Sequence, residues 1–124
     1  MLWVFDINET MLDLAPLDEV FARHAGTAAA RREWFDLLIH TALVTTTAGR
    51  YEDFSQIGAD CARTVARRRG GGFSDAGVRE LAAEMRRLPA HPEAPGALAA
   101  LRERGHRLVA LGNSPQAVID AQLG

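Results

Sequence analysis

The segment LWVFD at residues 2–6 decides the fold class of this chain. Its four apolar residues include β-branched and aromatic side chains and end at an aspartate, a pattern typical of a short buried strand. A similar apolar run returns at residues 108–111, where Gly, Asn, Ser and Pro follow it. Two buried strands separated by helical sequence predict an α/β fold with a parallel sheet.

The sequence between the two strands has helical periodicity and clear helix boundaries. Apolar residues spaced three and four apart predict helices from Pro16 to Gly26, over about 28–46 and over about 52–69. Ser74 is typical of an N-cap for a fourth helix. A fifth helix is predicted over about 93–104, and Pro115 opens a sixth.

The helical stretch at residues 15–88 is too long for a simple crossover, so we expect a helical cap inserted into an α/β core. The core comprises residues 1–14 and 89–124. Two strands bury too little apolar surface for a stable parallel sheet. We therefore expect either a homodimer or the N-terminal half of a longer protein, and only marginal stability and poor activity in the chain alone.

Charge and composition exclude several function classes. The 124 residues carry 16 acidic and 14 basic side chains, a balance that argues against binding to nucleic acid or to an anionic membrane surface. No apolar stretch approaches the roughly 18 residues of a membrane span, and Asp6, Asn8 and Glu9 interrupt a possible signal peptide. One cysteine cannot form an internal disulfide. We expect a cytoplasmic protein without nucleic-acid or membrane partners.

Polar side chains follow both predicted strands. Asp6 ends the first strand, and Asn113 and Ser114 follow the second. Because parallel strands end at the same edge of a sheet, we expect Asp6 and Asn113 to meet in a cleft beneath the cap. A carboxylate there can act as a nucleophile and form an ester that water cleaves. The alternative interpretation is that these residues only form turns.

The chain resembles the haloacid dehalogenase superfamily in two motifs. FDINETMLD at residues 5–13 is similar to its opening motif, a strand that ends in a nucleophilic aspartate with threonine four residues later. LVALGNSP at residues 108–115 is similar to its second motif. The helical insert and GRYEDF at residues 49–54 resemble the type II, or L-2-haloacid, branch. The resemblance covers the whole chain as the N-terminal portion of such a protein and implies an incomplete Rossmann-like core with an inserted cap.

This resemblance implies a hydrolase that acts on a small organic acid. Asp6 would displace halide from a 2-halo acid, and Thr10 would hold the Asp6 carboxylate by a hydrogen bond. Asn113 would hold the substrate or the leaving halide. The branch implies no metal and no other cofactor. Further candidates for contact with the substrate are Asn8, Ser114 and, on the cap, Phe35.

Two alternatives to the dehalogenase remain open. A phosphatase of the same superfamily would use Mg²⁺ and a second aspartate, where this chain has Asn8, whose amide has no titratable proton to give to a leaving group. The other alternative is a truncated and inactive domain, because the superfamily's third motif supplies a lysine and this chain has none. The chain also has Gly112 where the second motif has Ser or Thr, and no arginine between Glu33 and Gly49, where the branch has one for the substrate carboxylate.

Overall fold

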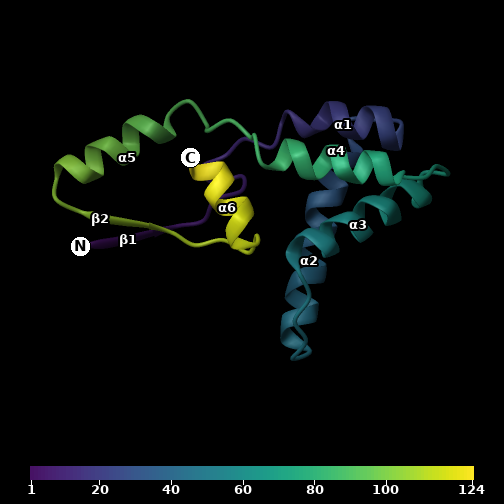
Figure 1. Ribbon diagram of the computed structural model, residues 1–124, viewed down its shortest axis with the longest axis horizontal. Coiled ribbons are helices and arrows are strands. Elements are labelled where there is room, and N and C mark those ends of the chain that lie inside the picture. The colour runs from purple at the N-terminus through teal and green to yellow at the C-terminus, as the bar shows by residue number, and fades with distance from the viewer.

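The computed structural model describes residues 1–124 and confirms the α/β class. Figure 1 shows the sheet, α5 (Ala94–Glu103) and α6 (Gln116–Leu123) in one half of the molecule and the remaining helices in the other half. None of the helices combines the length and apolarity that a bilayer crossing requires. In chain order the elements are β1 (Leu2–Phe5), α1 (Leu17–Ala25), α2 (Ala30–Thr47), α3 (Phe54–Arg68), α4 (Asp75–Met85), α5 (Ala94–Glu103), β2 (Arg107–Ala110) and α6 (Gln116–Leu123).

The sheet has two parallel strands, as the sequence predicts. Leu2 lies opposite Arg107 and Phe5 lies opposite Ala110. The ladder continues beyond β2, because the amide of Leu111 donates to the carbonyl of Phe5 at 2.8 Å. The residues that follow both strands therefore lie side by side.

The prediction that both strands are buried is wrong. Alternate residues of a strand point to opposite faces, and one face exposes Leu2, Val4, Val109 and Leu111, with Val4 54% and Leu111 67% exposed. Parallel strands become buried when helices cover both faces. Here α5 packs against β2, while the face formed by these four residues stays open to solvent.

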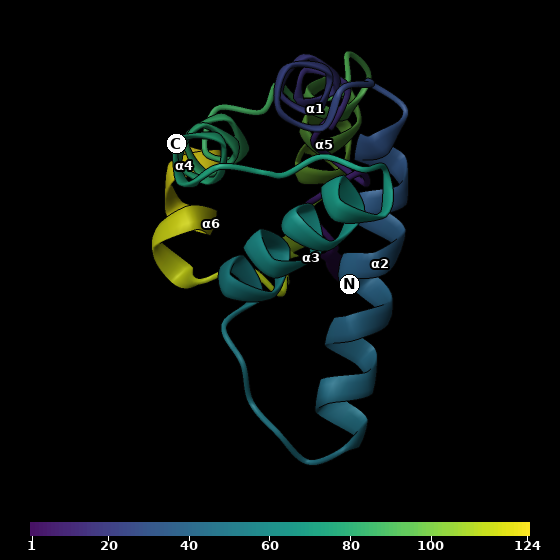
Figure 2. The same cartoon turned by 90° about the vertical axis from the view of Figure 1, so that its right-hand side faces the viewer.

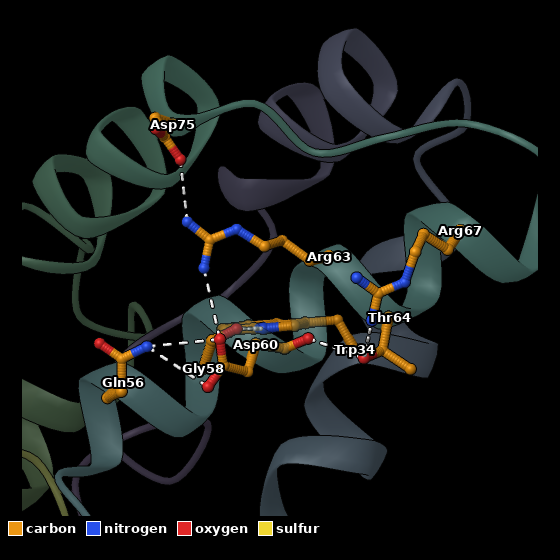
Figure 3. Close-up of polar contacts among 8 residues, drawn as sticks. All are labelled: Trp34, Gln56, Gly58, Asp60, Arg63, Thr64, Arg67 and Asp75. Atoms are coloured by element: carbon orange, nitrogen blue, oxygen red, sulfur yellow. Dashed lines mark hydrogen bonds and ion pairs between the residues drawn. The ribbon is translucent and has the colours of Figure 1, made fainter.

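The buried core lies instead among the cap helices. Trp34 of α2 is 2% exposed, its ring centroid lies 5.2 Å from that of Phe21, and its indole N–H donates to the Gly58 carbonyl at 2.8 Å (Figure 3). The view in Figure 2 shows α3 crossing α2, which projects beyond the other helices. The same core includes four residues of the segment after β1, namely Ile7, Met11, Leu12 and Leu14. One continuous core thus joins the cap to the end of the sheet.

Capping side chains set two of the helix boundaries. Asp53 accepts hydrogen bonds from the amides of Ser55 at 2.8 Å and Gln56 at 3.3 Å, so α3 begins two residues later than predicted. The predicted N-cap at Ser74 is confirmed, since its hydroxyl accepts from the amide of Gly77 at 3.0 Å. Such caps satisfy amides that have no partner within the helix.

An arginine connects α3 to α4 on the surface of the cap. The Arg63 guanidinium pairs with Asp60 of its own helix at 3.3 Å and with Asp75 of α4 at 3.0 Å (Figure 3). Exposed pairs of this kind contribute little individually. The two ion pairs of Arg63 therefore add little to the stability of the cap.

The two segments that connect the cap to the sheet run antiparallel beside each other. The amide of Asp13 donates to the carbonyl of Pro89, and the amide of His91 donates to the carbonyl of Met11, both at 2.8 Å. Leu12 and Ala90 form a bridge between these two hydrogen bonds. This pairing fixes where the loop after β1 lies relative to the end of α4.

Gly77 and Gly96 give a matched pair of helical substitutions with opposite expected effects. A Cβ at Gly77 would lie 2.8 Å from Cγ of His24, whereas a Cβ at Gly96 would meet no atom within 4 Å. Gly77→Ala is expected to destabilise the chain by about 1–3 kcal/mol through overpacking. Gly96→Ala is expected to stabilise it by about 0.5–1 kcal/mol. Denaturant midpoints measure both, and a stabilising Gly77→Ala would contradict the packing described.

Glu80 is expected to make the stability of the cap depend on acid. Its carboxylate contacts Nε2 of His24 at 2.6 Å and also pairs with Arg23, and these hydrogen bonds hold the pKa of Glu80 below its usual value. A lowered folded-state pKa gives stability that is present at neutral pH and is lost as pH falls through that pKa. Glu80→Gln should flatten the loss of stability below pH about 4.3. Thermal melts across pH test this, and Glu103→Gln, at an exposed position, should leave the profile unchanged.

Candidate active site

The loop after β1 folds back on itself and brings Thr10 to Asp6. The amide of Met11 donates to the carbonyl of Ile7 at 2.9 Å, which closes a tight turn. Glu9 within this turn is the only non-glycine residue with a positive φ, 64°, a conformation that costs such residues about 1–2 kcal/mol. As a result the Thr10 hydroxyl donates to Oδ2 of Asp6 at 2.9 Å.

The Asp6 carboxylate is exposed and has one free oxygen. Its hydrogen bond from Thr10 engages Oδ2, while Oδ1 has no protein partner and the group forms no ion pair. The one cysteine, Cys61, is buried instead, and desolvation raises the pKa of its thiol. Of these two nucleophile types, only the carboxylate is oriented and accessible, so the arrangement suits nucleophilic attack by Asp6.

A second polar cluster joins Asn8 to the other strand end. The Asn8 amide donates to Oγ of Ser114 at 3.3 Å, and its oxygen accepts from Nε2 of Gln122 at 3.1 Å. Gln122 also donates to the Met85 carbonyl at 2.8 Å, so it ties α6 to the end of α4. Both atoms of the Asn8 amide are therefore engaged within the protein.

Gln122 is a member of this cluster that sequence reasoning missed. It lies 114 residues from Asn8 in the chain, and no spacing or motif connects the two. Its Oε1 atom is buried without a partner, although Nε2 makes two hydrogen bonds. The contact depends on the position of α6 beside the cap, which local sequence patterns do not report.

Asn113 and Gly112 occupy the expected strand end but have different surroundings. The Asn113 side chain is exposed and forms no hydrogen bond with Asp6, so the structure brings Ser114, not Asn113, to the loop after β1. A Cβ at Gly112 would lie 3.1 Å from Cδ1 of Ile7, which is 1% exposed. Glycine at this position lets Ile7 pack closely against the second strand end.

A cavity of about 160 Å³ lies between the cap and α6. Trp34 reaches it, whereas Phe35 packs beside Trp34 at a centroid distance of 6.1 Å and does not line it. Ser114 belongs both to this cavity and to the cluster around Asn8. The lining residues are Trp34, Leu38, Phe54, Ser55, Gly58, Ala59, Val78, Leu81, Ala82, Met85, Arg86, Ser114 and Val118.

The chain does not gather a set of potential metal ligands. No three side chains of His, Cys, Asp or Glu lie close enough together to hold one ion. At the end of β1, Asp6 is accompanied by Asn8, whose oxygen already accepts from Gln122. The residues at the strand ends can therefore orient a carboxylate and a small cluster of amide and hydroxyl groups.

Solved structures show which architecture this is. An L-2-haloacid dehalogenase superposes with a TM-score of 0.88 at 25% identity, over 97% of this chain and 56% of that chain. The L-2-haloacid dehalogenase from Xanthobacter autotrophicus gives 0.86 at 20% identity, over 98% of this chain and 50% of that chain. The chain has the fold of the N-terminal portion of an L-2-haloacid dehalogenase. The predicted incomplete core with a helical cap is confirmed.

The haloacid dehalogenase fold is shared over about half the length of the proteins compared. A third solved dehalogenase has a TM-score of 0.83 at 23% identity, over 97% of this chain and 54% of that chain. No family model matches the sequence, and no curated protein does. The similarity of this chain to the dehalogenases is therefore seen in its three-dimensional structure.

Proposed function

We propose that this chain is the nucleophile-bearing part of a hydrolase that displaces halide from small 2-halo acids. The observation that carries the proposal is Asp6, an exposed carboxylate at the end of β1 with one oxygen held by Thr10 at 2.9 Å. The dehalogenase fold supports it, and the Xanthobacter enzyme has been solved with chloropropionic acid covalently bound. Covalent chemistry therefore has a precedent on this fold.

The proposed reaction has two steps. In the first, the free oxygen of Asp6 attacks the carbon that bears the halogen, a C–O bond forms, and the halide leaves with the electron pair of the broken bond. The hydrogen bond from Thr10 limits rotation of the carboxylate and so holds its free oxygen toward the substrate. In the second step, water cleaves the ester, which restores the Asp6 carboxylate and releases a 2-hydroxy acid and a proton.

The phosphatase alternative has less support from the residues around Asp6. Phosphate ester cleavage needs a proton for the alkoxide leaving group, whereas halide leaves without one. The residue two positions after Asp6 is Asn8, and both atoms of its amide are engaged by Ser114 and Gln122. An amide has no titratable proton to give to an alkoxide leaving group, so we favour the dehalogenase.

The test is covalent labelling of the chain itself. Incubation with excess 2-chloropropionate is expected to raise the intact mass by one propionate unit, with the label mapped to the peptide that contains Asp6 and at least one chloride released per label. Propionate, which has no leaving group, should give no label. Asp13→Asn is the matched variant, because Asp13 only accepts from the amide of Ala15 and should label normally.

Three outcomes would contradict the proposal. A label at a residue other than Asp6 would remove the nucleophile from the mechanism. Release of phosphate from a phosphate monoester in the presence of Mg²⁺, without release of chloride, would favour the phosphatase. If a folded chain shows no labelling and releases no chloride, the result would favour an inactive domain.

A further inference from the structure

The cavity between the cap and α6 has mainly apolar walls. Nine of its 13 lining residues are hydrophobic, among them Trp34, Leu38 and Phe54. Its volume is about 160 Å³, and an apolar cavity of about 150 Å³ is known to accept benzene. An apolar group up to about the size of a phenyl ring therefore fits within these walls.

Arg86 is the only charged residue that lines this cavity, and its guanidinium has no protein partner. It forms neither an ion pair nor a side-chain hydrogen bond, whereas the adjacent Arg87 pairs with Glu84. Two serines, Ser55 and Ser114, also line the cavity. An apolar pocket lined by one unpaired cation is complementary to a ligand with an apolar body and a single negative charge.

The position of Arg86 is fixed relative to the strand ends. It follows Met85, whose carbonyl accepts from Gln122 of α6 at 2.8 Å. Ser114, which shares the cavity, bonds to Asn8 at 3.3 Å, two residues after Asp6. The cavity thus meets the loop that carries Asp6 at Ser114.

We infer that Arg86 binds the carboxylate of a monocarboxylic acid whose apolar side chain occupies this cavity. The inference rests on the proposed function, which it deepens by naming the anion-binding residue of this chain. Arg31, a different arginine of the cap, is engaged with Asp18 at 2.7 Å and lies outside the cavity. Arg86 is the cation available to a ligand there.

The experiment compares a carboxylate with its neutral isostere. Phenylacetate and 2-phenylacetamide are titrated into the chain, and affinity is followed by calorimetry or by NMR shifts of the Trp34 indole. Wild type is expected to bind phenylacetate at least about tenfold more tightly than the amide, because hydrogen bonds to charged groups contribute strongly. Arg86→Ala should remove that preference, Arg86→Lys should keep part of it, and Arg87→Ala should keep all of it.

Three results would overturn the inference: equal affinity for acid and amide in wild type, an equal loss in Arg87→Ala and Arg86→Ala, or no binding of either probe. Circular dichroism confirms that each variant is folded, which is expected because Arg86 is exposed. Asp6→Asn separates the two proposals. If Asp6→Asn binds phenylacetate normally and wild type forms no label with 2-chloropropionate, only the proposed function fails. If wild type is labelled at Asp6 but Arg86→Ala keeps the preference for phenylacetate over the amide, only the inference fails.

Discussion

Replacing Asp6 with Asn is expected to slow covalent labelling by 2-chloropropionate by a factor of at least about 10⁴, because loss of a nucleophile removes the pathway that depends on it. The asparagine preserves the size of the side chain and can still accept from Thr10, which donates to Oδ2 of Asp6 at 2.9 Å. The amide oxygen is a far weaker nucleophile than a carboxylate. The loss therefore reports chemistry and not a change in packing.

The measurement is the initial rate of label formation by intact mass, with chloride release recorded in parallel. Asp6→Ala excludes a signal from deamidation of the new asparagine. Thr10→Val, which removes the hydroxyl but retains the branched shape, should slow labelling by a smaller factor, about 10-fold. Labelling of Asp6→Ala at the wild-type rate would show that another residue carries the reaction.

Replacing Trp34 with Ala is expected to lower the free energy of unfolding by about 3–5 kcal/mol, the range for truncation of a buried aromatic residue. Trp34 is 2% exposed and packs against Phe21, and its indole N–H donates to the Gly58 carbonyl. Typical domains have about 5–15 kcal/mol of stability in total. The variant should thus be largely unfolded well below the denaturant midpoint of the wild type.

Urea denaturation followed by circular dichroism measures this change, and Tyr51→Ala is the matched control. Tyr51 is 89% exposed, so its truncation should alter stability by less than about 0.5 kcal/mol. Trp34→Phe should fall between the two, because it retains a ring in the core and loses the indole donor. An unchanged midpoint in Trp34→Ala would mean that the core does not depend on the contact between α1, α2 and α3.

Local patterns predicted much of the fold and the centre of the site. Helix periodicity together with start residues such as Ser74 and Pro115 located all six helices, and the apolar runs located both strands, because these signals come from neighbouring residues. The contact between Asp6 and Thr10 spans four residues in one loop, so a local motif is enough to imply it. Asp53 shows the limit of this approach, since its role as the cap of α3 moved a boundary that periodicity alone placed earlier.

The sequence by itself determined the α/β class and the long helical insert, and the resemblance of residues 5–13 to a known motif implied the pairing of Asp6 with Thr10. Only the tertiary structure decided that Ser114 and Gln122, rather than Asn113, meet Asn8, that Arg86 faces a cavity, and that one face of the sheet is exposed. Periodicity and turn chemistry act over a few residues. Contacts across more than 100 residues, and the burial of a strand, depend on which helices pack beside it, and single-sequence patterns do not carry that information.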